Sequence, residues 1–545
     1  MTVPGLYCRA MRGWVRRALP IALLVWLAAV VAPPVAAEGS VLYRGNGAEP
    51  ETLDIHRSSG IPEFEIEVDL FEGLVHYGAA GEPVPGVAER WTVSDDGLIY
   101  RFELRETARW SNGDPVTADD FVYALRRAVT PSTASRYAFI LFPIANAEDI
   151  AGGAIADPAR LGVAAPDPRS LVITLKAPTP YFLGLLTHHM AFPVHRASIE
   201  RYGERWTRPG NLVGNGAYRL ARWVPQSEIT LVRNEHYWDA ATVKIDQVVY
   251  VATEDVGAEL RRYRADEIDV CNEVPIDQIG WIASHLKEDW RPTAYLGTYY
   301  YGFNLQAPPF KDAPKLRQAL ALAIDRETLV GRITRAGEKP AYGWVPPGIG
   351  NRYVQQLPDW ADLPQAERDR RARALYAEAG YGPDRPLRFE LLYNTSENHR
   401  RIAIAIAAMW KQTLGADVIL RNEEWKVYLA SRAAKSFQLL RQSWIGDYND
   451  ANTFLELFKS DIGDQNSEGY ANPRFDALMK QAERSIDLEA RARLMEAAER
   501  IMLDDLPIIP IYHYVSKRLV KPWVAGWVDN IVDVHPTRYL SLRRH

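Results

Sequence analysis

Helix-like and strand-like patterns of apolar positions alternate along the chain, most regularly between Ala366 and Trp444. Apolar residues three and four positions apart predict helices, and two of these runs end in a glycine, as many helices do. In the runs between them apolar and polar residues alternate singly, which predicts strands. The expected helices are 366–380, 397–415 and 423–435, and the expected strands are 387–394, 416–422 and 437–444. Strands separated by helices indicate βαβ units, and therefore an α/β fold with a mostly parallel sheet.

This order of elements also predicts where a ligand binds. In open α/β sheets, ligands bind beyond the carboxyl ends of the strands. The segments that follow three of the expected strands are 394–399, 423–425 and 444–447. We therefore expect a binding site to which these three segments contribute.

Residues 1–37 have the features of a secretory signal peptide. Four arginines and no acidic residue precede an apolar run over 18–32, and small residues follow up to Ala37. The run is shorter than the roughly 20 residues that span a bilayer, so a permanent anchor is the weaker interpretation. Cys8 precedes the apolar run, so a lipid-modified mature cysteine is not supported. We expect cleavage after Ala37 and export of a soluble protein to the periplasm.

The composition of the 545 residues is that of a globular protein. With 47% hydrophobic and 24% charged residues, a disordered or collagen-like chain is excluded. A chain of this length predicts about two or three domains. The one bias is towards aromatic residues, with 16 Trp, 27 Tyr and 15 Phe, which fits either a large core or a recognition surface.

Charge and cysteine content narrow the classes of partner. Four of the 64 Lys and Arg residues lie in residues 1–37, so the rest of the chain carries 60 of them against 69 Asp and Glu, a net charge of −9. We do not expect an acidic exported protein to bind nucleic acid or an anionic membrane surface. Only Cys271 lies beyond residue 37, so no internal disulfide is expected in the mature chain.

The common catalytic motifs are missing from the sequence. It contains no H-E-x-x-H, no G-x-S-x-G and no G-x-x-x-x-G-K-[ST]. Gly214 and Gly216 flank an asparagine in either a turn before a strand or a phosphate loop, and the missing third glycine favours the turn. A carboxylate pair for glycoside hydrolysis stays open, because its two acids can be distant in sequence.

No residue set predicts a metal or another cofactor. His188, His189 and His195 have no cysteine or carboxylate at ligand spacing, which favours ordinary loop histidines. The sequence around Asp447 begins like a calcium loop but lacks the ligand and the glycine that should follow. We therefore expect no cofactor.

The densest group of charged and aromatic residues lies between Glu424 and Tyr448. Asp447 has the chemistry to pair with an ammonium group, and the arginines of this segment suit a carboxylate. A ligand with both charges, such as a peptide, would match. Each residue also has a structural alternative: a helix N-cap for Asp447, a solvated face for the arginines and an amphipathic stripe for Trp425.

Ten sequence motifs then identify a family. The chain resembles the oligopeptide-binding proteins of ABC importers, within the family 5 extracellular solute-binding proteins, over essentially all of the mature chain. The motifs are DLFEGL (69–74), PGVAERW (85–91), LRETARWSNGDPVTADDFVYALRR (104–127), NGAYRL (215–220), RNEHYWD (233–239), YRADEIDV (263–270), TYYYGFN (298–304), RQALALAIDR (317–326), LLYNTSENHR (391–400) and VKPWV (520–524). The 104–127 run is the most specific to the group, and 391–448 indicates its peptide-binding branch.

The resemblance implies a bilobed periplasmic-binding-protein fold of type II with an additional domain, in which mixed or parallel sheets are flanked by helices. Lobe I would combine residues 38–75, 197–297 and 515–545. The additional domain II would occupy 76–196, and lobe II, or domain III, would occupy 298–514.

The resemblance also implies roles for ten residues in peptide binding. Asp447 would receive the α-amino group, and Arg441, Arg432 and His399 would offer cations to the carboxylate of peptides of different length. The backbone of 444–446 and of 299–301 would bind the peptide as an added strand. The residues implied to line the pocket or supply these bonds are Glu63, Tyr137, Tyr299, Trp425, Trp444 and Gly446. Some relatives bridge two cysteines beside the site, and Gly297 and Ile445 occupy those positions here.

The implied function is a periplasmic receptor that captures short peptides of about two to five residues by hinge closure, with little sequence preference. It would deliver them as a monomer to the membrane permease of an ABC importer, and it would not be an enzyme. The alternatives are the same scaffold specific for murein tripeptide or another peptide-like ligand and, from a different class, a secreted hydrolase.

Overall fold

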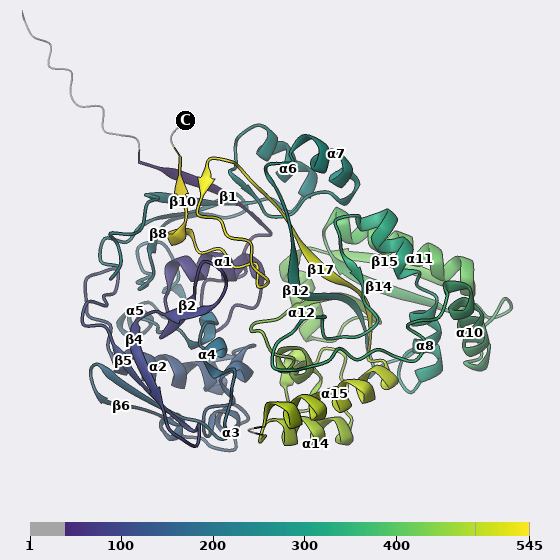
Figure 1. Cartoon of the computed structure of the whole chain (residues 1–545), viewed down its shortest axis with the longest axis horizontal. Helices are drawn as coiled ribbons and strands as arrows, with labels where there is room; N and C mark the ends of the chain where they lie inside the picture. Colours follow the sequence, from purple (N-terminus) through teal and green to yellow (C-terminus); the bar gives the residue numbers. More distant parts are fainter. Residues whose placement is uncertain (1–38, 486, 544–545) are drawn as a thin grey trace, which may run out of the picture. The chain divides into compact units, whose positions relative to one another are not determined.

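A mixed sheet of eleven strands dominates the computed structural model, which describes residues 39–485 and 487–543 (Figure 1). The predicted signal peptide lies outside these residues. The strand order is β15-β14-β16-β12-β17-β11-β1-β10-β9-β8, and β13 pairs with β17 off this path. The strands are β1 (Val41–Gly47), β8 (Tyr218–Val224), β9 (Glu228–Arg233), β10 (Gln247–Ala252), β11 (Val270–Cys271), β12 (Trp290–Phe303), β13 (Lys339–Pro340), β14 (Arg388–Asn394), β15 (Asp417–Glu423), β16 (Leu439–Ile445) and β17 (Ile508–Val520).

The predicted βαβ units are present at one end of this sheet. Strands β14, β15 and β16 are parallel, and helices α11 (Glu397–Leu414) and α12 (Trp425–Ala433) connect them. The two helices cover opposite faces, since Leu391 packs in the same cluster as α11 residues and its neighbour Leu392 packs with α12. The expectation of a mostly parallel sheet is met only in part. Strand β1 also pairs in parallel with β10 and β11, but β12, β13 and β17 pair with their neighbours in antiparallel fashion, and so do β8, β9 and β10 among themselves.

Strands β12 and β17 join the two halves of the sheet. They pair with each other from Trp290–Leu519 to Gly302–Ile508, and their register shifts between Ala294 and Thr298. On one side of this pair lie β14, β15 and β16, and on the other lie β1 and β8–β11. Strands β12 and β17 thus connect the two halves of the sheet (Figure 1).

A separate antiparallel sheet of order β4-β5-β7-β6 lies within the expected domain II. Its strands are β4 (Ala88–Val93), β5 (Ile99–Leu104), β6 (Val163–Asp167) and β7 (Ser170–Thr174). Helix α2 (Ala118–Val129) follows Thr117, whose side chain and that of Asp120 form a capping box. Two further pairs are β2 (Val75–Tyr77) with β3 (Pro83–Pro85) and β18 (Val524–Ala525) with β19 (Ser541–Leu542).

The glycines at 214 and 216 are packing residues and not a phosphate loop. A Cβ atom added to Gly214 would lie 2.2 Å from the carbonyl oxygen of Leu70, and one added to Gly216 would lie 2.5 Å from that of Asp69. The chain therefore passes against the end of α1 (Ile61–Leu70) before it enters β8, as the turn interpretation predicts.

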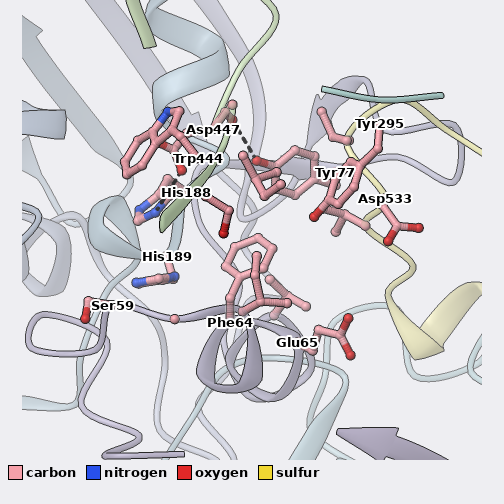
Figure 2. A pocket seen from close by; sticks show the side chains of 18 of the residues that line it. Ser59, Phe64, Glu65, Tyr77, His188, His189, Tyr295, Trp444, Asp447 and Asp533 are labelled. Carbon is pink, nitrogen blue, oxygen red and sulfur yellow. Dashed lines mark hydrogen bonds and ion pairs between the residues drawn. The ribbon is translucent and has the colours of Figure 1, made fainter. Parts of the chain in front are cut away.

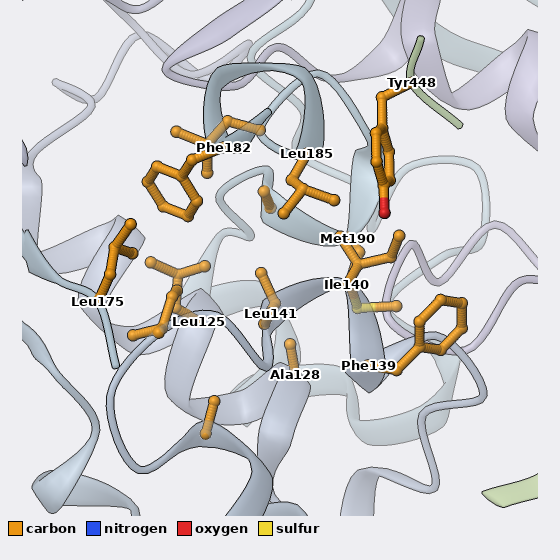
Figure 3. Packing of buried hydrophobic residues seen from close by; sticks show 14 of the residues in the cluster. Leu125, Ala128, Phe139, Ile140, Leu141, Leu175, Phe182, Leu185, Met190 and Tyr448 are labelled. Atoms are coloured by element: carbon orange, nitrogen blue, oxygen red, sulfur yellow. The ribbon is translucent and has the colours of Figure 1, made fainter. Parts of the chain in front are cut away.

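The largest hydrophobic cluster extends from the four-stranded sheet to the segment that follows β16. Figure 3 shows Tyr448 beside Met190, Ile140 and Leu185. The ring of Tyr448 also stacks on Tyr181 at 4.9 Å, with 1° between the ring planes. This packing holds the backbone beside Asp447 in place.

The other helices surround these sheets. They are α3 (Ala147–Ala151), α4 (Phe182–Leu185), α5 (Arg196–Tyr202), α6 (Val256–Arg264), α7 (Ile279–His285), α8 (Pro314–Leu322), α9 (Arg326–Thr328), α10 (Gln365–Glu378), α13 (Asn452–Leu455), α14 (Pro473–Ala482) and α15 (Leu488–Asp505). Over residues 39–485 and 487–543, no helix is both long and apolar enough to cross a membrane.

Candidate functional site

Two adjoining cavities lie where β16 ends. Counted with the space that opens to solvent, the first measures about 1060 Å³ and the second about 1260 Å³. The residues that line both are Ile61, Tyr295, Trp425, Ser443, Ile445 and Asp533. The sequence predicted a site beyond the strand ends, and the cavities lie there. Their lining includes residues of segments 394–399 and 444–447, and Trp425.

One edge of β16 is open between the two cavities. Strand β14 pairs with β16 only at Leu439 and Leu440, whereas β12 pairs with it as far as Ile445. Gly446 donates its N–H to the carbonyl oxygen of Leu296, 2.7 Å away, on the β12 side. Because successive residues direct their backbone groups to opposite sides, Ser443 and Ile445 direct theirs away from β12, into the cavities.

Asp447 lies in the first cavity with its carboxylate almost unpaired (Figure 2). Its Oδ1 is 3.7 Å from Nε2 of His188, and its Oδ2 is 3.5 Å from the hydroxyl of Thr453. Within the described residues, no Lys or Arg lies within ion-pair distance of it. Its backbone is better held: the Tyr77 hydroxyl donates to the Asp447 carbonyl oxygen at 3.0 Å, and the Asp447 N–H donates to Thr453 at 3.1 Å.

The environment makes Asp447 an acceptor that lacks a cation. Burial raises the pKa of its carboxyl to about 7, and the contact with Thr453 lowers it only in part. The helix N-cap alternative is wrong, because α13 begins at Asn452 and is preceded by Ala451. A buried carboxylate of this kind is stabilised by any ammonium group that enters the cavity.

A stack of rings forms the wall beside Asp447. Tyr137 lies between Trp444, with ring centroids 6.1 Å apart, and His188, with centroids 5.1 Å apart. All three rings line the first cavity. Burial lowers the pKa of His188 to about 3, so this wall carries no charge at neutral pH.

Arg441 is the complementary group in the second cavity. The side chain is buried, and its guanidinium donates to Asn394 at 3.1 Å and to the Tyr514 hydroxyl at 2.9 Å, and lies 4.5 Å from the centroid of the Tyr299 ring. All of these partners are neutral, and its Nε has no acceptor. Among the described residues no carboxylate pairs with Arg441. It is therefore a buried cation without an anion.

The other basic residues that line the cavities differ in whether a carboxylate pairs with them. Lys517 pairs with buried Glu338 at 3.0 Å, and Arg518 pairs with Asp533 at 2.8 Å and with Glu65. Arg432, half-buried on α12, lines the first cavity, and no carboxylate of the described chain lies within ion-pair distance of it. Arg441 and Arg432 are thus the cations available to a ligand.

His399 lines the second cavity, but the expectation that it is a cation is not met. Burial, and then the charges of Arg441 and Lys517, lower its pKa well below the usual value. A bound carboxylate would therefore meet a neutral imidazole, whose Nδ1 has no partner in the described structure. His399 offers a hydrogen bond in place of a charge.

Two of the ten predicted residues do not line either cavity. Glu63 is buried behind the first cavity, where its carboxylate accepts the N–H of Glu51 and burial raises its pKa to about 7. Tyr299 lies beneath Arg441. The other eight, Asp447, Arg441, Arg432, His399, Trp425, Trp444, Gly446 and Tyr137, all contribute to the lining.

The expected backbone contribution of 299–301 is wrong. These residues lie in the middle of β12, with β16 on one side and β17 on the other. Their backbone groups already belong to two ladders, so none is left for a ligand, and their three side chains are buried in the core.

Several lining residues were not predicted from the sequence to belong to the site. Tyr77, Glu65, Asp533, Lys517 and Arg518 line the cavities, and so does His188, which the sequence analysis had considered only as an ordinary loop histidine. A signal existed for two of them, because Lys517 and Arg518 lie in the strand-like run 508–520, which is mostly apolar, and burial of such charges requires partners. No group of three or more His, Cys, Asp or Glu in the described chain could hold a metal ion.

Comparison with known proteins adds to this geometry. Residues 82–466 match the family described as "Bacterial extracellular solute-binding proteins, family 5 Middle". The chain is 42% identical over 505 residues to the periplasmic oligopeptide-binding protein OppA of Salmonella typhimurium, and the alignment covers 91% of this chain and 92% of that protein. It is 40% identical over 525 residues to the periplasmic murein peptide-binding protein MppA of Escherichia coli, with 96% and 97% covered. The structure of Haemophilus influenzae OppA in complex with RPPGFSPFR matches with a TM-score of 0.90 at 38% identity, covering 93% of this chain and 99% of that one.

Proposed function

Because the chain belongs to family 5 of the bacterial extracellular solute-binding proteins, we propose that it is the peptide-binding receptor of an ABC importer. It captures peptides of about two to five residues in extended form and delivers them to the permease in the membrane. Members of this family are binding receptors, which removes the hydrolase alternative.

The observation that carries the proposal is a pair of opposite, unbalanced charges in one site. Asp447 is a largely buried carboxylate, with 13% of its side chain exposed, that has no cation, and Arg441 is a buried guanidinium that has no anion. Burial of a lone charge is costly, so each favours a ligand that supplies its partner. A peptide in its zwitterionic form has an ammonium group at one end and a carboxylate at the other.

The open edge of β16 supports an extended ligand. Arg441 and Asp447 are six residues apart, which corresponds to about 20 Å of extended chain. A peptide with its amino end at Asp447 and its carboxyl end towards Arg441 would run antiparallel to β16. Its backbone would bond to Ser443 and Ile445, and its side chains would enter the two cavities alternately.

The same cavities explain a weak preference for sequence. Both cavities are larger than one side chain, and positively and negatively charged groups line them. Water can fill the space that a small side chain leaves and can mediate contacts with a polar one. Recognition then depends on the backbone and the termini of the peptide.

Hinge closure fits the way the site is assembled. Ile61 and Phe64 lie on α1, which contacts β1 and β8 in one half of the sheet, whereas Trp425 lies on α12 and Ser443 on β16, both of which belong to the other half. A Cβ atom added to Gly60 would lie 3.0 Å from the Trp425 ring, so the two sides meet closely. The β12–β17 pair connects the two halves, and its register shift at 294–298 marks the segment where bending is proposed.

A murein tripeptide or another peptide-like molecule is the second candidate ligand. It is favoured by the similarity to MppA, which nearly equals that to OppA. The matching relatives are named as periplasmic proteins, and the predicted signal peptide would direct this chain to the same compartment. Mass spectrometry of ligands released from the purified protein would separate the two candidates, because murein peptides contain residues that ordinary peptides lack.

Calorimetry with one tripeptide in two forms tests the central proposal. Ala-Ala-Ala with a free amino group should bind, and its N-acetylated form should bind at least a hundredfold more weakly, because acetylation removes the ammonium partner of Asp447. Equal binding of the two forms would contradict the proposal.

A further inference from the structure

Two tyrosine rings stack between parts of the chain that only β12 and β17 connect. The first part, residues 39–289, precedes β12 and carries β1–β11, and the second part, residues 304–507, lies between β12 and β17 and carries β13–β16. Tyr181 belongs to the first part, directly before α4, and Tyr448 belongs to the second part, shortly after β16. Their ring centroids are 4.9 Å apart, with 1° between the ring planes. The stack is therefore a contact between the two parts that does not involve β12 or β17.

The side chain of Tyr448 is seated in the hydrophobic cluster of the first part. Figure 3 shows Tyr448 beside Leu185, Ile140 and Met190, which all come from that part, and 4% of Tyr448 is exposed. A Cβ atom added to Gly184 would lie 3.0 Å from Cβ of Tyr448, so the backbone of the first part approaches Tyr448 closely. Separation of the two parts would expose this apolar surface to water, which is unfavourable.

A cation of the second part also contacts the ring of Tyr181. The guanidinium of Arg491, on α15, lies 4.8 Å from the centroid of this ring. Asp450 holds the guanidinium with two hydrogen bonds, at 2.7 and 2.9 Å. Stacked aromatic rings attract each other, and so do a guanidinium and the face of a ring. The second part thus holds Tyr181 through two different side chains.

These contacts are separate from the ligand cavities but adjoin the binding residue Asp447. Tyr181, Tyr448 and Arg491 line neither cavity. Tyr448 follows Asp447 directly in the chain, so the two residues move together. Bending of the β12–β17 pair at 294–298, as proposed above, would withdraw Tyr448 from its place beside Tyr181 as the cavities open.

We propose that Tyr181 is a latch for the closed arrangement of the site, and that it slows the release of a bound peptide whatever the sequence of the peptide. The inference rests on the proposed peptide-binding function and hinge closure. Tyr181 acts through Tyr448 and Arg491, so it is a positioning residue and not a part of the peptide site. A contact that is present in the closed state and absent from the open one shifts this equilibrium by the same factor for every ligand.

Peptide release from the full mature protein, measured by stopped flow with Ala-Ala-Ala, is the first test. Tyr181→Ala should release the peptide about tenfold faster than wild type, because both ring contacts are lost. Tyr181→Phe keeps the ring and should stay within about twofold of wild type. Tyr181→Leu keeps an apolar side chain that supports folding and should fall between these two. Tyr43→Ala removes a ring that is 39% exposed and should release the peptide at the wild-type rate.

Calorimetry with two forms of the peptide separates a latch from a ligand contact. Tyr181→Ala should lower the affinities for Ala-Ala-Ala and for its N-acetylated form by the same factor, about tenfold, so that the ratio of the two affinities stays that of wild type. A ratio that changes would mean that Tyr181 acts on the ammonium site at Asp447, and would overturn the latch. A release rate of Tyr181→Ala and Tyr181→Leu within twofold of wild type would overturn it as well.

A measurement without peptide keeps this inference distinguishable from the proposed function. Ala156→Cys in the first part and Gln481→Cys in the second place spin labels at two exposed positions, and Cys271 is buried. Unliganded Tyr181→Ala should show a larger share of long distances between the labels than wild type, and Tyr181→Phe should show the wild-type distribution. If no peptide binds to wild type, the peptide-binding proposal fails, and the label distances alone decide on the latch. Identical distributions in wild type and Tyr181→Ala would then overturn it.

Discussion

His188 directs the protonated nitrogen of its ring towards the carboxylate of Asp447. Its Nδ1 accepts the N–H of Met190 at 3.2 Å, so the proton of the neutral ring is on Nε2, and this atom lies 3.7 Å from Oδ1 of Asp447. The ring lines the first cavity and stacks on Tyr137. At 3.7 Å this N–H is beyond hydrogen-bond distance, so it acts on the ionised form of Asp447 only as a neutral dipole, which does not compete for the charge of a ligand.

Variants of His188 should therefore differ according to whether they keep the donor. His188→Gln retains an N–H group near the place of Nε2 and should bind Ala-Ala-Ala within about threefold of wild type, whereas His188→Leu should bind about tenfold more weakly. The leucine variant should also shift the pH midpoint of binding upward, because the pKa of Asp447 rises without the donor. Equal affinities and midpoints for both variants, measured by calorimetry, would mean that the ring acts only by packing.

Replacement of Asp447 should separate binding from stability. Asp447→Asn removes the charge that the peptide ammonium requires, so we expect a loss of about 3–5 kcal/mol in binding, a hundredfold or more. The unliganded variant should be more stable than wild type at pH 8 by up to about 4 kcal/mol, because a buried lone carboxylate is removed. Calorimetry and chemical unfolding measure the two effects. Asp384→Asn, at an exposed position, should change neither.

Peptide affinity should fall as the pH falls below 7. The pKa of Asp447 is raised to about 7 in the unliganded protein, and binding requires the ionised form. Between pH 7 and 5 the affinity should decrease about tenfold per pH unit, with release of about one proton on binding. Above pH 8 it should fall again as the peptide amino group, with a pKa of about 7.7–8.0, loses its proton.

The groups around Asp447 do not obscure this profile. Burial lowers the pKa of His188 to about 3 and raises those of Tyr77 and Tyr137. The pKa of Glu456 is raised to about 8. None of these values lies between pH 5 and 7, but the pKa of Glu63, behind the same cavity, is also raised to about 7, so the Asp447→Asn variant is the control that assigns the slope to Asp447. An affinity that is constant over this range, or an Asp447→Asn variant with the wild-type slope, would contradict the prediction.

Arg441 should recognise the carboxyl end of the peptide. C-terminal amidation should weaken binding to wild type by about 2 kcal/mol or more, because the guanidinium loses its only anion. Arg441→Gln should bind the free peptide weakly and should be insensitive to amidation. The comparison is a double-mutant cycle in calorimetry, and a coupling energy near zero would exclude a direct contact.

The buried pair of Asp450 and Arg491 should be essential for stability. Both guanidinium nitrogens of Arg491 donate to the carboxylate of Asp450, at 2.7 and 2.9 Å, and Arg491 also lies 4.8 Å from the centroid of the Tyr181 ring. Asp450→Asn leaves a buried cation without a partner and should lower the free energy of unfolding by about 3–5 kcal/mol. Glu489→Gln, which affects the exposed pair with Arg493, should change it by less than about 1 kcal/mol. Denaturant unfolding distinguishes these outcomes.

The predicted helices and strands between 366 and 445 agree with the structure to within a few residues, because their signals are local. Periodicity in these segments reports which face is buried, and glycine at 380 and 415 marks two helix ends. The place of the site followed from the same pattern, since the segments after β14 and β16 had to meet at one edge of the sheet. The antiparallel pairing of β12 and β17 left no such signal, because it joins segments about 200 residues apart.

Two predicted roles of site residues differ from the structure for the same reason: they depend on contacts between segments that are far apart in the sequence. Tyr299 belongs to the motif TYYYGFN, from which we predicted a role in the site. In the structure, both edges of its strand are paired with other strands. His399 is charged or neutral according to how deeply it is buried and which cations lie near it, and Lys517 comes from a strand that the sequence does not relate to His399.

What the sequence by itself determined is the chemistry available to the protein: an acidic chain with a single cysteine beyond residue 37, alternating elements, and a segment with arginines, tryptophans and Asp447. Only the tertiary structure decided which of these charges are balanced. Lys517 is balanced by Glu338 and Arg518 by Asp533, whereas Asp447 and Arg441 have no partner of opposite charge among the described residues. The physical reason is that pairing and desolvation act over a few ångströms in space, between strands that lie far apart along the chain.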